Sequence, residues 1–157
     1  MHAFLNKIES EVTKMGSKLK DQRQLKIVRV NSILNNSEAK ILTKFCEALK
    51  LKANAKNYTV EMIDMAKEYF ESEDNLCLLF ILEDIDFYIE STKQMMLYKI
   101  LDMLTYAKIP FVFVATSQKV DIIDSFEKRI KSRFSHRQIL FYEEKVNFFQ
   151  ERVTDMI

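Results

Sequence analysis

Glycine and proline are almost missing from this chain. Among its 157 residues, Gly16 is the single glycine and Pro110 the single proline. A phosphate-binding loop of the form G-x-x-x-x-G-K-[ST] needs glycines, because its backbone N–H groups must come close to the phosphate oxygens. The residues given therefore cannot build the usual loop of that kind.

Cysteine and histidine are also scarce. Cys46 and Cys77 stand alone in apolar company, and His2 and His136 are the two histidines. Because no pair has the Cys-x-x-Cys spacing, we expect both cysteines to pack in a core in a reducing compartment rather than to hold a metal or form a disulfide. The absence of a signal peptide and of an 18-residue apolar run predicts the cytosol or nucleus, with no membrane partner.

The charge is nearly balanced, with 24 basic and 23 acidic residues and a net charge of +1. No global field therefore recruits nucleic acid or a membrane, and an electrostatic partner must meet a local patch. At 157 residues and 48% hydrophobic composition, the chain is long enough for one folded domain with its own core.

One stretch organises the prediction of the fold. Residues 76–82 are seven consecutive apolar residues, which suit a strand covered on both faces. Glu83, Asp84 and Asp86 follow immediately. In open parallel α/β sheets, ligands gather beyond the carboxyl ends of the strands, so carboxylates there can reach a Mg²⁺-nucleotide, as in a Walker B element. The alternative is a buried strand that simply exits into a polar loop.

Further strands and helices alternate along the chain. Residues 25–33 read as a strand near a sheet edge, since Lys26 and Arg29 must find water. The apolar run 111–115 reads as a second buried strand, followed by Thr116, Ser117 and Gln118. A last strand is expected at 138–142. Helices are expected at 4–15 (ended by Gly16), 38–49, 59–71, from a Ser91/Gln94 capping box to about 104, from Asp121 to about 133, and at 143–157.

This alternation predicts an α/β fold, with helices on both faces of a mostly parallel three-layer sheet. Polar residues after the strand at 111–115 are then expected beside the carboxylates that follow the strand at 76–82.

The helix that starts at Asp121 is strongly basic in its second half. Arg129 and Arg133 are four residues apart and so share one helical face, away from the apolar stripe. Cations near the C-terminus of a helix are a common stabilising pattern. The alternative is an arginine pair presented to a phosphate that another molecule holds.

Two blocks carry a family resemblance: Phe80-Ile-Leu-Glu-Asp-Ile-Asp-Phe87 and Glu127-Lys-Arg-Ile-Lys-Ser-Arg-Phe-Ser-His-Arg-Gln138. Both resemble the AAA+ ATPase domain of subunit 4 of the eukaryotic origin recognition complex, the second block almost residue for residue. The similarity runs roughly over 4–142 and is strongest after Leu76. It implies the three-layer P-loop NTPase core of the AAA+ family.

The resemblance also implies a function. The family belongs to a nuclear complex that binds replication origins and helps load the replicative helicase. Arg133 matches the family's arginine finger, which reaches the γ-phosphate of ATP bound by the neighbouring largest subunit, and Arg129 matches a second basic residue of that interface. ATP and Mg²⁺ are expected at a subunit interface rather than tightly bound to this chain alone. The expected partners are the other subunits, especially the largest, and origin DNA through the complex.

The chain departs from the family in the acidic motif. The family's Walker B order is Asp then Glu, whereas Glu83 precedes Asp84 here. Both residues are therefore weak candidates for binding a metal and a nucleotide. Hydrolysis of ATP by the chain as given is not expected. Ser117 or Gln118 falls at the family's sensor 1 position.

A second departure concerns extent. Residues 1–157 match a partial AAA+ domain without the first strand, the phosphate loop, the helical lid or the winged-helix domain. We expect the missing strand to leave a gap between 111–115 and 138–142, and favour a longer natural N-terminus.

Two other hypotheses stay open at this point. One is a self-sufficient P-loop ATPase whose phosphate loop is encoded upstream of Met1. The other is a degenerate α/β interaction module, in which Glu83, Asp84, Arg129 and Arg133 are only solvated surface.

Overall fold

The computed structural model describes residues 2–18, 23–51, 58–72, 76–91, 94–134 and 137–141. Helices and strands alternate within these ranges, as the sequence predicts. The elements are α1 (His2–Lys18), β1 (Gln24–Asn31), α2 (Glu38–Ala48), α3 (Tyr58–Ser72), β2 (Leu76–Glu83), α4 (Ile85–Ser91), α5 (Met95–Tyr106), β3 (Phe111–Ala115), the 3₁₀ helix η1 (Ile122–Ser125) and α6 (Lys128–Lys131).

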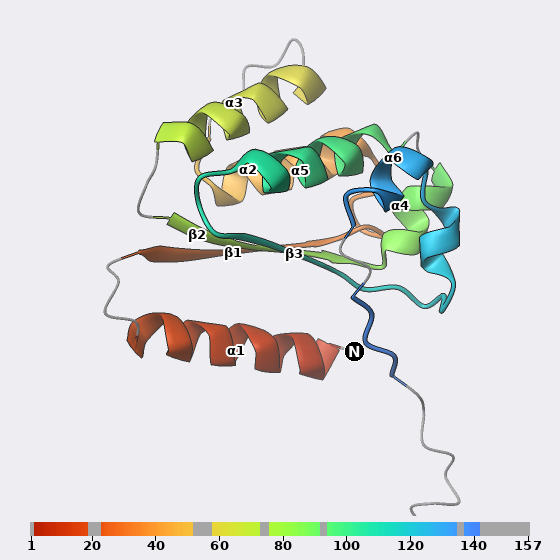
Figure 1. The fold of residues 1–157 in the computed structure, drawn as a ribbon, viewed down its shortest axis with the longest axis horizontal. Coiled ribbons are helices and arrows are strands. Elements are labelled where there is room, and N and C mark those ends of the chain that lie inside the picture. Colours follow the sequence, from red (N-terminus) through yellow and green to blue (C-terminus); the bar gives the residue numbers. More distant parts are fainter. Residues whose placement is uncertain are drawn as a thin grey trace, which may run out of the picture.

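The three strands form one parallel sheet in the order β1-β2-β3. Helix α1 covers one face of this sheet, and α2, α3 and α5 cover the other (Figure 1). The predicted three-layer α/β architecture is therefore confirmed. Within the described residues, no helix is both long and apolar enough to cross a membrane.

Strand β2 lies in the centre and packs on both faces. Its even-numbered side chains, such as Phe80, join the large core under α2, α3 and α5, where Phe80 meets Phe45 edge to face at 5.0 Å between ring centroids. Its odd-numbered side chains Leu79 and Ile81 pack with Leu5 of α1 in a second, smaller core. Strand side chains alternate between faces, so an uninterrupted apolar run requires cover on both sides.

Strand β1 lies at an edge of the described sheet, as predicted, but its charged residues are not left to water. Lys26 donates a hydrogen bond to the Tyr69 hydroxyl of α3 at 2.8 Å, and its ammonium lies 5.1 Å from the centre of that ring. Arg29 forms ion pairs with Glu9 of α1 and Glu83 of β2. The expectation that both cations need solvent was wrong, because acceptors distant in sequence satisfy them.

Two helix boundaries differ from the prediction. Gly16 does not end α1, which continues to Lys18. Ser91 does not cap α5 but ends the unpredicted helix α4, and α5 starts at Met95 after Gln94 in a left-handed conformation, with φ 52°. A glycine within a helix costs only about 1 kcal/mol relative to alanine, so packing on the sheet outweighs that cost.

The expected helix from Asp121 is divided into η1 and α6. Phe126 lies between the two with an extended backbone, φ −76° and ψ 143°. The buried side-chain amide of Gln94 bridges this break: its Nε2 donates to the carbonyl of Ser125, and its Oε1 accepts from the backbone N–H of Glu127, both at 3.0 Å. A contact more than 30 residues away in sequence thus replaces the helical bonds that the break removes.

The expected last strand is absent from the described residues. Residues 137–141 are irregular and lie outside the sheet. Ile139, Leu140 and Phe141 are 72%, 46% and 51% exposed, respectively. In the described part of the chain, these residues do not join the ladder of β1, β2 and β3, which a strand of this sheet would require. Tyr142 and the expected helix at 143–157 lie outside the described residues.

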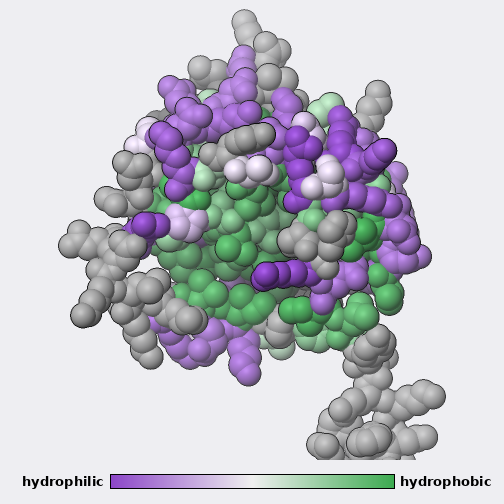
Figure 2. All heavy atoms as spheres, viewed as in Figure 1, coloured by the Kyte–Doolittle hydropathy of each residue, from purple (hydrophilic) through white to green (hydrophobic). Residues whose placement is uncertain are grey.

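A hollow of about 710 Å³ runs along β3, which is the second edge of the described sheet. Its lining includes Leu5 and Ile8 of α1, the whole of β3 and residues 137–141. Val112 of β3 is 55% exposed there. Figure 2 shows hydrophobic side chains gathered across the middle of this view, with hydrophilic ones above and below.

The two cysteines are free thiols. Cys46 is buried in the large core, as expected, and burial raises the pKa of its thiol to about 11. Cys77 of β2 is half-buried.

The open edge of β3 can be tested by amide hydrogen exchange. Leu78 N–H donates to the carbonyl of Pro110, and Thr116 N–H donates to the carbonyl of Leu82, so even-numbered residues of β3 face β2. Odd-numbered N–H groups therefore point toward the hollow. We expect the Phe113 amide to exchange at least about tenfold faster than the Val112 and Val114 amides. Equal protection of all three, measured by NMR, would contradict an open edge.

Candidate functional site

The carboxyl ends of β2 and β3 meet, as the parallel sheet requires. The backbone N–H of Asp84 donates to the Thr116 hydroxyl at 3.1 Å, and Ile85 N–H donates to the Thr116 carbonyl at 2.9 Å. The predicted proximity of the acidic residues after β2 and the polar residues after β3 is confirmed. Four of the candidate residues, Glu83, Asp84, Ser117 and Gln118, lie at this edge of the sheet.

Glu83 is engaged by a cation of its own chain. Its Oε1 accepts a hydrogen bond from Arg29 Nε at 2.6 Å and forms an ion pair with Arg29 Nη2. The Glu83 side chain is 7% exposed and the Arg29 side chain 26%. Arg29 Nη1 also donates to Asn6 at 2.7 Å and contacts Glu9 at 3.2 Å, both on α1. This guanidinium therefore joins α1, β1 and β2 at one point.

Asp84 lies in a left-handed backbone conformation, with φ 53°. Glycine normally takes such positions, but aspartate tolerates them better than most residues. The conformation turns the chain from β2 directly into α4. The carboxylate Oδ2 accepts a hydrogen bond from Asn31 Nδ2 at 2.8 Å, and the same amide group lies 3.4 Å from Glu83 Oε2.

Asp86, which the sequence analysis did not select as a site residue, organises the loop after β3. Its Oδ1 accepts from the Ser117 hydroxyl at 2.7 Å, and its Oδ2 accepts from the Gln118 N–H at 3.0 Å. Asp86 is 7% exposed. Ser117 and Gln118 are therefore held in place by a buried carboxylate. The sequence feature that could have indicated this role is the acidic residue two positions after Asp84.

These carboxylates do not fit a magnesium ion held by this chain alone. Mg²⁺ requires oxygen ligands in near-ideal octahedral geometry. A guanidinium already neutralises Glu83, and Asp84 points its oxygen at an amide donor. Among the described residues, no group of three or more His, Cys, Asp or Glu side chains could hold a metal ion.

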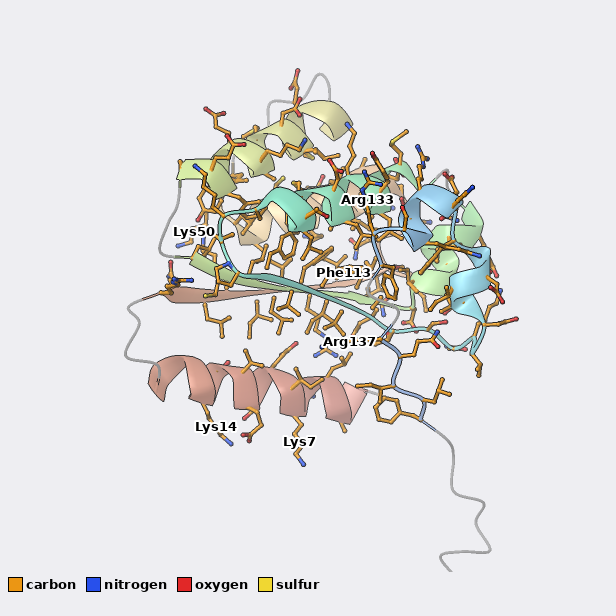
Figure 3. All side chains as sticks on the ribbon, in the orientation of Figure 1. Lys7, Lys14, Lys50, Phe113, Arg133 and Arg137 are labelled. Atoms are coloured by element: carbon orange, nitrogen blue, oxygen red, sulfur yellow. The ribbon has the colours of Figure 1, made fainter. Side chains whose placement is uncertain are left out.

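The second group of candidate residues lies between α6 and α5. Arg133 Nε donates to Asp102 Oδ1 at 3.1 Å, and its Nη2 lies 3.0 Å from the same oxygen. Nη2 also donates to the Tyr98 hydroxyl at 3.0 Å, and the guanidinium carbon lies 4.4 Å from the Tyr98 ring centre. Figure 3 shows Arg133 on the α5 side of the sheet and Arg137 on the α1 side.

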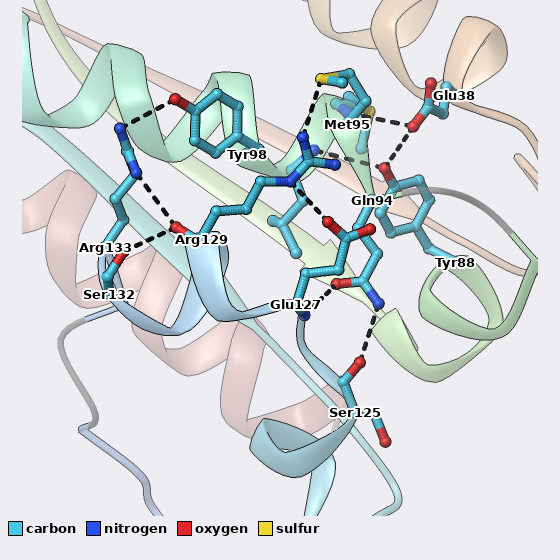
Figure 4. Close-up of polar contacts among 12 residues, drawn as sticks. Glu38, Tyr88, Gln94, Met95, Tyr98, Ser125, Glu127, Arg129, Ser132 and Arg133 are labelled. Atoms are coloured by element: carbon cyan, nitrogen blue, oxygen red, sulfur yellow. Dashed lines mark hydrogen bonds and ion pairs between the residues drawn. The ribbon is translucent and has the colours of Figure 1, made fainter.

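Arg129 contacts the same tyrosine. Its guanidinium carbon lies 5.2 Å from the Tyr98 ring centre, its Nε pairs with Glu127 at 2.6 Å, and its Nη1 lies 3.8 Å from the Met95 sulfur (Figure 4). The predicted helical face is not shared, because α6 ends at Lys131 and Arg133 lies in the following turn, but the two arginines do lie together on Tyr98. Ile130 is fully buried, apart from them. The aromatic platform was missed because Tyr98 is more than 30 residues from either arginine.

Some candidate residues from the acidic end of the sheet and from the arginine group border the same hollow. Arg133, Ser117 and Gln118 all border the hollow along β3, whereas Glu83 and Asp84 are absent from its lining. Among the described residues, the lining includes Arg137 and Lys119 but no carboxylate. Lys119 donates a hydrogen bond to Glu90, and this bond, together with the charge of the carboxylate, raises the pKa of the lysine. The side of the hollow nearest the carboxyl ends of the strands is therefore rich in hydrogen-bond donors and cations.

Solved structures define the class of fold. The chain is similar to the ORC1 protein of Aeropyrum pernix, solved in complex with DNA, with a TM-score of 0.70 and 15% identity over 96% of this chain and 38% of that one. It is also similar to Cdc6p of Pyrobaculum aerophilum, with a TM-score of 0.59 and 16% identity over 92% of this chain and 38% of that one. The chain is thus similar in fold to these two proteins, and the predicted fold class is confirmed.

Sequence comparison points to one subunit. The chain is 28% identical over 141 residues to origin of replication complex subunit 4 of Oryza sativa, covering 85% of this chain and 29% of the relative. It is 33% identical over 82 residues to origin recognition complex subunit 4 of Homo sapiens, covering 49% of this chain and 19% of the relative. The resemblance to subunit 4 is confirmed, although the chain spans less than a third of these relatives. No family model matches it.

The ion pair between Arg29 and Glu83 should contribute to the stability of the fold. Replacing Arg29 by methionine leaves a carboxylate buried without its cation, so we expect the free energy of unfolding to fall by about 2 to 4 kcal/mol in chemical denaturation. Adding Glu83→Gln to Arg29→Met should restore much of that loss.

The exposed pair Lys44–Glu47 provides the control, because both side chains are more than half exposed. Lys44→Met should change stability by less than about 1 kcal/mol. A loss for Arg29→Met no larger than this control would show that Arg29 does not stabilise the acidic end of β2.

Proposed function

We propose that this chain acts as a subunit of a nuclear origin recognition complex, in which Arg133 contacts ATP bound by a neighbouring subunit. The observation that carries the proposal is the position of Arg133: it lies within the block 127–138 that resembles subunit 4, and it borders the hollow at the carboxyl end of the sheet. Sequence similarity to subunit 4 and the Orc1/Cdc6 fold support it.

The chemistry of Arg133 suits this role. A guanidinium presents a rigid, planar set of N–H donors and keeps its charge at all physiological pH values, so it can stabilise the charge that develops on a transferred phosphoryl group. Arg133 is 27% exposed in its side chain and rests on the face of Tyr98. Arg129, on the same platform, would supply a second cation to the interface.

The acidic residues support a division of labour between subunits. Glu83 is bound by Arg29, and Asp84 by Asn31, so the chain uses its Walker B-like acids to hold its own fold. ATP and Mg²⁺ would then be held by the neighbouring, largest subunit. This arrangement speaks against the alternative of a self-sufficient ATPase. Origin DNA would be contacted through the assembled complex, which would go on to support helicase loading.

The proposal predicts that Arg133→Ala lowers the ATPase activity of the reassembled complex by about 10³-fold, the scale of an arginine finger. Arg133→Lys should recover little of this activity, because an ammonium lacks the planar donor set. The measurement is steady-state ATP hydrolysis, with complex assembly checked by size-exclusion chromatography.

Lys131→Ala is the matched control, since Lys131 is the last residue of α6, two positions before Arg133, and pairs with Asp124 at 3.7 Å. It should retain the activity of the parent complex. If Arg133→Ala and Lys131→Ala hydrolyse ATP at equal rates in fully assembled complexes, the assigned role of Arg133 is wrong.

A further inference from the structure

Every nitrogen of the Arg133 guanidinium has an acceptor within its own chain. Each of its three nitrogens donates a hydrogen bond: Nε to Asp102, Nη2 to the Tyr98 hydroxyl, and Nη1 to the carbonyl of Arg129 at 3.3 Å. Figure 4 shows the contacts with Tyr98 and Arg129. Bidentate binding of a phosphate needs two N–H groups side by side on adjacent nitrogens. In this position the guanidinium cannot offer such a pair without giving up contacts that it already makes.

Asp102 differs from the other two acceptors because it carries charge. Its Oδ1 contacts both Nε and Nη2, at 3.1 and 3.0 Å, and its side chain is 23% exposed. A carboxylate at this distance offsets the positive charge that attracts a phosphate, and partial burial strengthens the interaction relative to a surface pair. Asp102 and Tyr98 are four residues apart on α5 and so lie on the same helical face.

We propose that Asp102 restrains Arg133, so that a nucleotide phosphate on the adjoining subunit must displace this carboxylate before the guanidinium can engage it. The inference rests on the proposed function, and it makes the Asp102–Arg133 ion pair the regulated contact of that site. Arg129 pairs with a different carboxylate, that of Glu127, two residues before it. Removal of the charge on Asp102 should favour the engaged position of Arg133 alone.

The experiment compares four reassembled complexes, containing the parent chain, Asp102→Asn, Arg133→Ala or Asp124→Asn. Asparagine keeps the size and an acceptor oxygen of Asp102 but removes its charge. We expect Asp102→Asn to lower the KM for ATP by about threefold to tenfold, with kcat equal to or above the parent value. Asp124→Asn, which removes a carboxylate that pairs with Lys131 instead, should leave both constants unchanged.

The outcomes separate the two claims. If Arg133→Ala has no effect on hydrolysis, the proposed function fails, and the inference fails with it. If Arg133→Ala abolishes hydrolysis while Asp102→Asn leaves KM unchanged, only the inference is overturned. A loss of kcat in Asp102→Asn would also overturn it, since Asp102 would then orient Arg133 for catalysis instead of holding it back.

A second measurement does not depend on hydrolysis. The rate at which phenylglyoxal modifies Arg133 in the nucleotide-free complex is followed by mass spectrometry. Release from Asp102 should raise this rate several-fold in Asp102→Asn, with Arg129 as the internal reference. An unchanged rate at Arg133 would contradict the restraint. If Asp102→Asn fails to assemble, Asp102→Ser takes its place in both measurements.

Discussion

The central strand β2 imposes the constraint on which the rest of the structure depends. It is buried along both faces and ends in Glu83, a carboxylate with almost no access to water. Burial on two faces requires two helical layers, and a buried carboxylate requires a cation. Arg29 satisfies the second requirement and, through Glu9, joins α1 to the sheet. One guanidinium thus binds both the acidic end of β2 and the helix α1.

This arrangement separates the two kinds of charge that a nucleotide site needs. The acids at the end of β2 are paired within the fold, whereas Arg133 and Arg129 lie on Tyr98 at the margin of the molecule. Under the proposed function, a second subunit would supply the phosphate loop and the metal that complete the site. Arg133 forms an ion pair with Asp102, and in our proposal this pair holds the cation until a phosphate displaces the carboxylate.

Local patterns in the sequence predicted the layers but not the contacts between distant residues. The apolar runs predicted strand β2 and the bounds of β3 at 111–115. A strand that is buried on both faces is recognisable as an uninterrupted run of apolar residues. Arg29 was expected in water because its partner Glu83 is 54 residues away. The break between η1 and α6 at Phe126 was also not predicted, because Gln94, which bridges it, is distant in sequence. Arg133 was found by family resemblance, whereas Asp102 carries no signal of its own and was found only in the structure.

The most direct test is a structure of the assembled complex with a non-hydrolysable ATP analogue, in which the distance from the Arg133 guanidinium to the γ-phosphate is measured. Our account predicts that a guanidinium nitrogen lies within about 3 Å of a γ-phosphate oxygen of the neighbouring subunit, and that Asp102 has lost its contact. Arg133 still bound to Asp102, with no phosphate in reach while the analogue occupies the adjoining site, would contradict it.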